Sequence, residues 1–529
     1  MSTPRTQVRV NVPNRSSFDK SFKHILTAKV GRITPICCKY MCPGAKGHVR
    51  VPLSACLPPL ASDTFMRADV KVEAFLVPMR LLYGGFESWL TSKRLRDVAG
   101  ATWVTAELPR LVVGDSGYVA DITHMGAGSL CDYLGLKVST DPNHFPTGKS
   151  YYNVFPLLAY HRVFDDWYRN PRLTNPIFTQ PVGTQSFNLA SLPFQAYGTI
   201  QDIPIDSLFA DGVHLYSVRQ RNYGADYFTI ATASAQKGNA QSVVVASNQF
   251  TIQALREANS LQQFAERSNL ASPRLQDYVR AHFGADLSSG VAQRAILLGS
   301  ASYPVYSKGI FAQSDVTAGN NPFASVGAQY GQGRASGIDF EFSFECNEPS
   351  YLLINATLVP EANYGSGIDH EFLLLNAAGS QVDLPDPLLE NTGNEPIFSS
   401  ELSGYMLGNT AGLPNPGQVF GYVPKNTWYK CGRNQVSGLL RSGESLDSFV
   451  AQRVFNTQPA IGTNFVSIPA QALDNVTAVT SDLSNYGCWI DCFIDLKVSE
   501  PLTESAMPSL QDPAYEHGHS VVLNQKTDL

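Results

Sequence analysis

Hydrophobic and polar residues alternate along several stretches of this 529-residue chain, as they do in β-strands with one buried face. The clearest case is residues 489–498, where one face carries Ile490, Cys492, Ile494, Leu496 and Val498. The same period of two occurs in residues 70–77 and 340–346. Residues 351–359 follow the latter after the short sequence NEPS, so these two segments predict a β-hairpin.

Further strand-like runs lie at residues 24–41, near the start of the chain, and around residue 467. The chain therefore begins and ends in strands that are far apart in sequence. We expect these first and last strands to lie side by side in one sheet system, as they do in Greek-key and jelly-roll sandwiches.

Four segments between the strands have helical periodicity instead: residues 128–136, 156–171, 252–267 and 272–284. The first has Ser129 as N-cap, an acidic residue three positions later, and Gly135 as its end. All four interrupt a β framework, and they predict helical insertions in a mainly β protein.

The segment SPRLQDYVRAHFG, residues 272–284, raises the question of a catalytic histidine. Ser272 is a suitable N-cap, Pro273 suits the first helical position, and Gly284 can end the helix. One face of this helix is apolar and consists of Leu275, Tyr278, Val279 and Phe283. His282 falls in the last turn, where the helix dipole favours positive charge, so we expect a structural role for it.

Composition indicates a surface that carries little charge. Only 16% of residues are charged, against roughly 25% in a typical soluble protein, while Gly, Pro, Phe and Tyr are abundant. This composition favours many turns between β segments and suits a surface that is covered by copies of the same chain. No apolar run of 18 residues and no secretory signal occurs, which predicts a protein made in the cytosol without a membrane partner.

The net charge of −6 argues against a wholly basic nucleic-acid-binding domain, but residues 1–23 form a local basic patch. Against the single acid Asp19, this segment has five cations: Arg5, Arg9, Arg15, Lys20 and Lys23. It predicts a mobile polar arm whose cations contact DNA phosphates. A solvated terminus without a partner is the equally simple alternative.

Sequence signatures of catalysis, metal binding or cofactor binding are not found. TGKS at residues 147–150 lacks the first glycine of a phosphate-binding loop, and the HGH sequence at 517–519 has the wrong spacer for a nuclease motif. The nine cysteines contain no clean pair with zinc-ligand spacing, and we expect reduced, buried thiols. The pairs Asp165-Asp166 and Asp491 with Asp495 are interpreted as surface carboxylates. We therefore expect no catalytic residue, no metal and no cofactor.

The order of several sequence blocks is more specific than any motif. They include FLVPMRLL at 75–82, FPLLAYHRVFDDWYRNPRL at 155–173, RQRNYGADYFT at 219–229, residues 254–305 with the AHFG sequence, and FIDLKVSEPLTESAMPSL at 493–510. In this order they resemble the major capsid protein of the small single-stranded DNA phages, the Microviridae, and especially its gokushovirus-like branch. Only residues 232–250 occupy the position of the long insertion that forms a threefold protrusion in that branch.

The resemblance implies a mainly β fold, an eight-stranded antiparallel jelly roll (β-sandwich) with long loops and α-helical insertions. The expected organisation is a basic arm over 1–23, one jelly-roll capsid domain over 24–510, and a polar tail over 511–529. Helical insertions are expected over about 84–300, and long loops over about 315–337 and 360–420. The resemblance also implies a T=1 icosahedral shell, assembled in the host cytoplasm, that encloses circular single-stranded DNA. Implied partners are a small basic DNA-binding phage protein, a minor pilot protein and a host surface receptor.

Two other classes of protein fit the composition less well. A β-sandwich lectin or cell-surface binding protein would use aromatic loops to stack on sugars, but it would normally carry a secretion signal. A large enzyme on a β framework would need a catalytic constellation, and the sequence offers none. The mass of the protein in solution separates these classes, because a shell protein forms megadalton assemblies.

Overall fold

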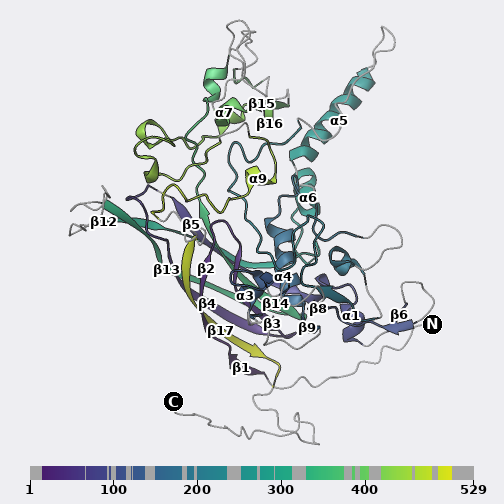
Figure 1. Ribbon diagram of the computed structural model, residues 1–529. Coiled ribbons are helices and arrows are strands. Elements are labelled where there is room, and N and C mark those ends of the chain that lie inside the picture. Colours follow the sequence, from purple (N-terminus) through teal and green to yellow (C-terminus); the bar gives the residue numbers. More distant parts are fainter. Residues whose placement is uncertain are drawn as a thin grey trace, which may run out of the picture.

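The protein is described by a computed structural model, and Figure 1 shows its arrangement. The structure describes residues 15–502 except 66, 92–93, 97–102, 115–120, 122, 138–148, 181–187, 196–198, 235–251, 271–273, 291, 312–328, 375–383, 388–392, 404–418, 456–458 and 479–486. Two antiparallel sheets form a sandwich, and helices cover the outer face of one of them.

The larger sheet has six strands, in the order β1-β17-β4-β13-β12, with β2 also paired to β17. Their bounds are β1 Ser16–Asp19, β2 Phe22–Ala28, β4 Lys46–Cys56, β12 Tyr306–Phe311, β13 Gln329–Glu345 and β17 Cys488–Glu500. Both β1 and β2 pair with β17, so the first strands of the chain lie beside the last, as the sequence predicts.

The smaller sheet has four strands in the order β11-β5-β14-β3. Their bounds are β3 Thr34–Met41, β5 Ala68–Pro78, β11 Ile296–Pro304 and β14 Ser350–Pro360. Eight of these strands can be numbered 1 to 8 in chain order: β2, β3, β4, β5, β11, β13, β14 and β17. The larger sheet then contains strands 1, 8, 3 and 6 as successive neighbours, and the smaller sheet contains strands 2, 7, 4 and 5. This order is consistent with the eight-stranded jelly roll expected from the sequence.

The main hydrophobic core lies between the two sheets. The predicted apolar face of β17 is buried there, as is the face of β5 that carries Val70, Val72, Ala74 and Leu76. The other face of β17 is largely exposed, which explains why its sequence alternates so regularly.

A second core lies on the other side of the smaller sheet. Every residue of β14 is buried, because this strand has the first core on one face and a helical layer on the other. The layer contains α4 Phe155–Val163, its continuation η3 Phe164–Tyr168, and α3 Leu130–Leu134. The Ser129 hydroxyl accepts a hydrogen bond from the amide of Asp132, and Gly135 ends α3 with φ +94°, so the predicted caps are confirmed.

A third, smaller core is formed late in the chain, around the hairpin of β15 Asn394–Phe398 and β16 Val419–Pro424. Its buried residues include Phe228, Tyr364, Ile397, Phe420 and Phe465. Sequence reasoning missed this core because it combines short segments that are far apart in sequence.

The remaining elements are short, apart from two helices that stand out from the sandwich, α5 Ile252–Leu270 and α6 Leu275–Phe283. The others are η1 Met79–Leu81, α1 Phe86–Leu90, β6 Arg94–Arg96, β7 Trp103–Thr105, β8 Arg110–Val113, β9 Ser150–Asn153, η4 Leu189–Phe194, β10 Asp202–Pro204, η5 His370–Leu373, α7 Ser400–Ser403, α8 Thr427–Lys430, η8 Gly438–Leu440, η9 Asp447–Phe449 and α9 Thr463–Val466. No helix within the described ranges combines the length and hydrophobicity needed to cross a membrane.

Three predictions about strands and loops were wrong. Residues 340–346 and 351–359 do not form a hairpin, because β13 pairs with β4 and β12, whereas β14 pairs with β3 and β5. Residues 329–337, predicted as loop, extend β13. Their glycines allow close approach of another segment, since a Cβ on Gly331 would lie 2.1 Å from the Ser62 carbonyl oxygen. Residues 463–466, in the run predicted as a strand near 467, form α9.

The start of α6 was also predicted too early. The helix begins at Leu275 with Arg274 as its N-cap residue, whereas Ser272 and Pro273 lie outside the described residues. Its predicted end is confirmed, because Gly284 has φ +68° and its amide donates to the Arg280 carbonyl.

Candidate functional site

The described residues of the predicted basic arm belong to the larger sheet. β1 and β2 begin within the range predicted as an arm, whereas Arg5 and Arg9 lie outside the described residues. Arg15 donates to the side chain and backbone of Ser499, at 3.3 and 2.8 Å. The last residues of the predicted arm, from Ser16 onward, therefore form part of the larger sheet.

The two lysines of this segment have acidic partners. Lys20 Nζ lies 2.7 Å from Glu500 Oε1, and that carboxylate is almost fully buried. Lys23 Nζ lies 3.1 Å from Asp491 Oδ2, and both side chains are more than half exposed. A phosphate would have to displace or share these carboxylates, so the lysines are weaker candidates for DNA contact than their sequence position indicates.

The exposed face of the larger sheet carries further ion pairs between neighbouring strands. They are Lys46–Glu345 at 2.9 Å and the two-pronged Arg50–Asp339 at 2.6 Å, and the His48 ring nitrogen lies 2.9 Å from the Glu341 carboxylate. Hydrogen bonding to Arg50 lowers the pKa of the Asp339 carboxyl. Positive and negative groups alternate across this face, so it is not a basic track for a nucleic-acid backbone.

The cysteines lie mostly in the sandwich, and all nine are free thiols. Burial raises the pKa of Cys38 and of Cys488 to about 12, which keeps both protonated and unreactive. No group of three His, Cys, Asp or Glu side chains positioned to hold a metal ion occurs within the described ranges.

A buried ionic site joins the smaller sheet to the segment after α4. Glu73 of β5 accepts two hydrogen bonds from Arg221, at 2.5 and 2.9 Å, and one from the Tyr168 hydroxyl at 2.5 Å. Burial alone would raise the pKa of Glu73, but the hydrogen bonds and charge of Arg221 hold it below its usual value. The side chains of Glu73, Arg221 and Tyr168 are hydrogen-bonded within this group, so we interpret the site as one that stabilises the fold.

The imidazole of His161 is fully buried in α4. Its Nε2 donates to the Leu215 carbonyl at 2.8 Å, and its Nδ1 accepts from Arg219 Nε at 3.0 Å. Burial, together with the positive charge of Arg219, lowers the pKa of His161 well below its usual value. This histidine is thus held neutral as part of the packing.

Asp165 and Asp166, interpreted from the sequence as surface residues, are in fact buried. Asp165 pairs with Arg169 at 2.6 Å and Asp166 with Arg162 at 3.0 Å. Burial raises the pKa of Asp166 despite this partner. The interpretation was wrong because the neighbouring arginines and the covering segments come together only in the folded chain. Asp491, by contrast, is exposed as predicted.

His282 has the structural surroundings that the sequence predicts. Its Nε2 lies 3.2 Å from the Ser268 hydroxyl of α5, and its ring stacks on Tyr278 and contacts Phe264. It therefore ties α6 to α5. The apolar face of α6 is not packed as expected, however, and none of the residues of this helix is fully buried.

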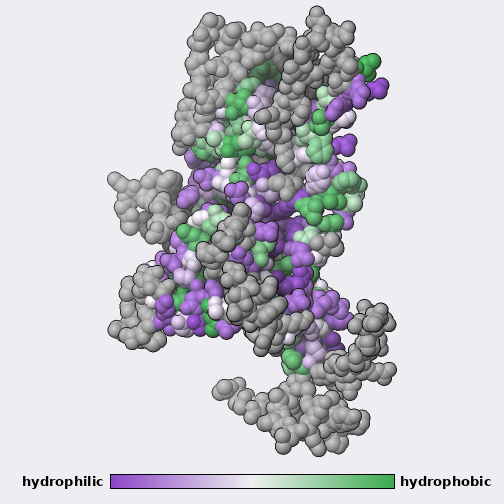
Figure 2. All heavy atoms as spheres, turned by 90° about the vertical axis from the view of Figure 1, so that its right-hand side faces the viewer, coloured by the Kyte–Doolittle hydropathy of each residue, from purple (hydrophilic) through white to green (hydrophobic). Residues whose placement is uncertain are grey.

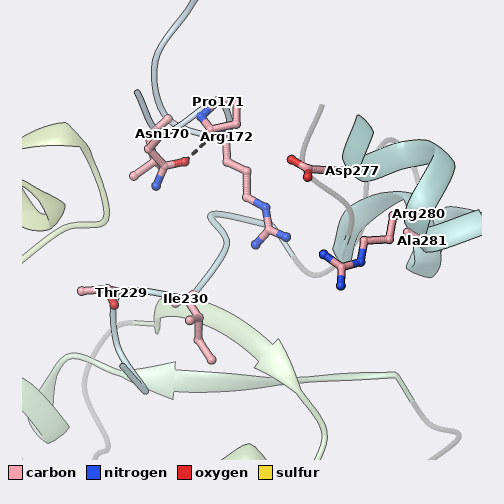
Figure 3. A pocket seen from close by; sticks show the side chains of 10 residues that line it. Asn170, Pro171, Arg172, Thr229, Ile230, Asp277, Arg280 and Ala281 are labelled. Carbon is pink, nitrogen blue, oxygen red and sulfur yellow. Dashed lines mark hydrogen bonds between the residues drawn. The ribbon is translucent and has the colours of Figure 1, made fainter. Parts of the chain in front are cut away.

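A surface depression of about 520 Å³ lies between α6 and the segments 170–173 and 229–231. Figure 3 shows Arg172 and Arg280 pointing into it, with Asp277 on the same side of α6. The depression is open and has charges of both signs, and its lining includes no histidine, cysteine or serine. The hydroxyl group in this lining, that of Thr229, donates to the Gly224 carbonyl at 3.0 Å and accepts from the Asp226 amide at 2.8 Å, so it is bound to the backbone and not to a general base.

Comparisons with known proteins agree with this reading of the structure. A model of the family described as capsid protein (F protein) matches residues 6–247 and 190–510. Capsid protein VP1 of Chlamydia phage 1 is 23% identical over an alignment of 603 residues, covering 94% of this chain and 96% of that protein. The resemblance to capsid proteins of small single-stranded DNA phages is confirmed. The protein is thus a structural component of a virion, and the chain belongs to the capsid protein (F protein) family.

Proposed function

We propose that copies of this chain assemble into a T=1 icosahedral shell that encloses a circular single-stranded DNA genome. The observation that carries the proposal is the family match, which extends over most of a chain folded as a two-sheet sandwich. A sandwich of this kind presents loops and insertions at its margins, and we expect neighbouring copies to make contact there. The shell role requires no catalysis.

Assembly is tested by the mass and shape of the purified protein. We expect sedimentation velocity to find a megadalton species and electron microscopy to show closed particles of uniform diameter. A protein that stays a monomer or small oligomer, in assembly buffer and in lysate of producing cells, would exclude the shell and favour a lectin-like binding role.

We propose that the genome contacts the N-terminal segment, chiefly through Arg5 and Arg9. Lys20 and Lys23 have carboxylate partners, and Arg15 is hydrogen-bonded at the sheet edge. Each neutralised phosphate contributes about −0.7 to the log-log salt slope for single strands. A few cations per subunit cannot balance a packaged genome, so a small basic DNA-binding phage protein is expected to supply further charge. A minor pilot protein and a host surface receptor complete the proposed partners.

This contact is best tested by substitution, because deletion beyond Ser16 would remove β1 and its pairing with β17. The variant Arg5→Gln/Arg9→Gln should assemble normally but retain less DNA, measured as nuclease-protected DNA per particle. The matched control Arg5→Lys/Arg9→Lys keeps the charge and should retain DNA. Equal DNA content in all three proteins would rule out the proposed role of these arginines.

A further inference from the structure

The depression between α6 and the segments 170–173 and 229–231 has more positive than negative charge in its lining. Arg172 and Arg280 point into it from opposite walls, and Asp277 is its acidic lining residue (Figure 3). Helix α6 lies on the right in Figure 1, and Figure 2, which faces that side, shows hydrophilic residues over much of the middle of the molecule. The lining therefore has one net positive charge at a hydrophilic part of the surface.

The ion pair that Arg280 forms is weak enough for a ligand to replace. Its Nε lies 3.6 Å from Asp286 Oδ1, and the two side chains are 76% and 83% exposed. Exposed pairs of this kind contribute little free energy, since both groups stay hydrated. An anion that enters the depression can therefore draw the Arg280 guanidinium away from Asp286.

Two further arginines are hydrogen-bonded beside the walls of the depression. Arg274 donates to three backbone carbonyls, at 2.5, 2.8 and 3.0 Å, and one of them belongs to Arg169, directly before the lining. Arg294 donates to the side chain of Gln276, directly before Asp277, and to a backbone carbonyl. These acceptors are neutral, so both guanidinium groups keep their full positive charge.

Positive charge is consequently in excess around the depression. Four arginines in or beside it have an aspartate as a neighbour: Arg162, Arg169, Arg172 and Arg280. The charges of Arg274 and Arg294 are left over. Burial, followed by the positive charges of Arg294 and Arg169, lowers the pKa of Arg274 to about 10, which is the effect of a positively charged environment. A ligand with two negative charges would offset this excess.

The chemistry and size of the depression narrow the class of ligand. Guanidinium groups bind carboxylates and phosphates through paired hydrogen bonds, and a phosphate monoester carries close to two negative charges at neutral pH. The volume of about 520 Å³ falls in the range of small-molecule sites. Half of the lining residues are apolar: Pro171, Leu173, Ile230, Ala231 and Ala281. A phosphate attached to a small organic group fits this lining better than a bare ion does.

We propose that this depression binds the phosphate group of a phosphate monoester, with Arg172 and Arg280 as its hydrogen-bond donors. The class comprises free small phosphate esters and phosphorylated groups on a larger molecule, which share this chemistry. The inference goes beyond the proposed shell and does not depend on it, because the site is contained in one chain.

The first test measures binding to the purified full-length protein by isothermal titration calorimetry in a buffer without phosphate. The probes are glycerol 3-phosphate, inorganic phosphate and glycerol. We expect both phosphates to bind and glycerol not to bind. Equal affinity for the two phosphates would indicate the free anion as the source, whereas tighter binding of the ester would indicate a ligand whose organic part contacts the apolar lining. Failure of both phosphates to bind would overturn the inference.

Variants then locate the binding. Arg280→Gln should weaken binding of glycerol 3-phosphate about tenfold or more, because it removes a charge-assisted hydrogen bond. The matched control Arg256→Gln removes the same charge from α5, outside the depression, and should bind like the wild type. Asp277→Asn should tighten binding several-fold, since it removes the carboxylate that repels the ligand. Circular dichroism should be the same for all of these proteins.

Three results would contradict this assignment. One is equal affinity of the Arg280→Gln and Arg256→Gln variants, which would place the bound phosphate elsewhere. Another is weaker binding by Asp277→Asn, which would show that the charge balance of the depression does not control affinity. The third is binding of a short oligothymidylate in the absence of binding by either phosphate, which would indicate a contact with nucleic acid instead.

Discussion

His161 illustrates how single residues here serve packing and not chemistry. Both of its ring nitrogens are used, one as a donor to Leu215 and the other as an acceptor from Arg219. A second proton would break the bond with Arg219 and place two positive charges together in the core. The folded protein therefore keeps this residue neutral at pH values where the unfolded chain protonates it.

This arrangement predicts acid sensitivity. Below about pH 6.5 the unfolded chain binds a proton at His161 that the folded protein does not bind. The free energy of unfolding should therefore fall by up to about 1.4 kcal/mol per pH unit below 6.5, and this contribution should be fully present above that pH. Urea unfolding of the dissociated subunit between pH 5.5 and 7.5 measures the slope. His161→Gln should flatten it, and an unchanged slope would contradict the assignment.

The Glu73–Arg221 pair predicts a different response to substitution. Glu73→Gln leaves the buried Arg221 charge uncompensated and should lower the free energy of unfolding by about 3 kcal/mol. The double variant Glu73→Leu/Arg221→Met removes both charges and should recover much of that loss, as determined by urea unfolding at pH 7. A double variant less stable than Glu73→Gln would show that the pair itself contributes net stability.

At the scale of elements, the alternation of apolar and polar residues identified β5 and β17. In β17 only one face is fully buried, and in β5 every second residue from Val70 to Leu76 is apolar and faces the main core. The alternation did not identify strand pairing. Residues 340–346 and 351–359 are adjacent in sequence yet lie in different sheets, since their partners come from distant segments.

Capping chemistry located α3 and the end of α6, because Ser129 and Gly284 act locally. The burial of Asp165 and Asp166 depends on Arg274 and Arg294, about a hundred or more residues further on, and no local pattern shows it.

The two faces of β17 provide a test of this reading within one strand. Ile494 is fully buried, whereas the neighbouring Phe493 is 44% exposed. Ile494→Ala should cost about 2–5 kcal/mol of unfolding free energy, the range for a large buried side chain cut to alanine. Phe493→Ala should cost less than about 1 kcal/mol when measured on dissociated subunits. Similar losses for both would indicate that the exposed face of the sheet is covered within the subunit.

At the scale of the whole molecule, the stability of a shell depends on how many contacts each subunit makes with its neighbours. A contact that buries about 600 Å² of apolar area gains roughly 15 kcal/mol, while association costs about 4 to 15 kcal/mol. A single contact is therefore marginal, whereas a subunit held by several neighbours at once is secure. The low content of charged residues favours a surface that is covered by copies of the same chain, but composition does not show which surfaces make the contacts.

Assembly driven by such contacts should strengthen on warming. Apolar burial is almost entirely entropic near room temperature, so light scattering should show more particles at about 25 °C than at about 5 °C. Raising sodium chloride from about 0.1 to about 0.5 M should change the yield little, because the exposed ion pairs are balanced in sign. Assembly that is favoured by cold and abolished by salt would indicate an electrostatic mechanism instead.

The position of β17 has a consequence for how the protein is made. This strand lies between β4 and the N-terminal strands β1 and β2, yet the ribosome synthesises it after every other strand of both sheets. Until then, the larger sheet has a gap that no nascent chain can fill, and closure must await near-complete translation. A product that terminates early cannot finish its sandwich, so we expect such fragments to be degraded and kept out of the virion.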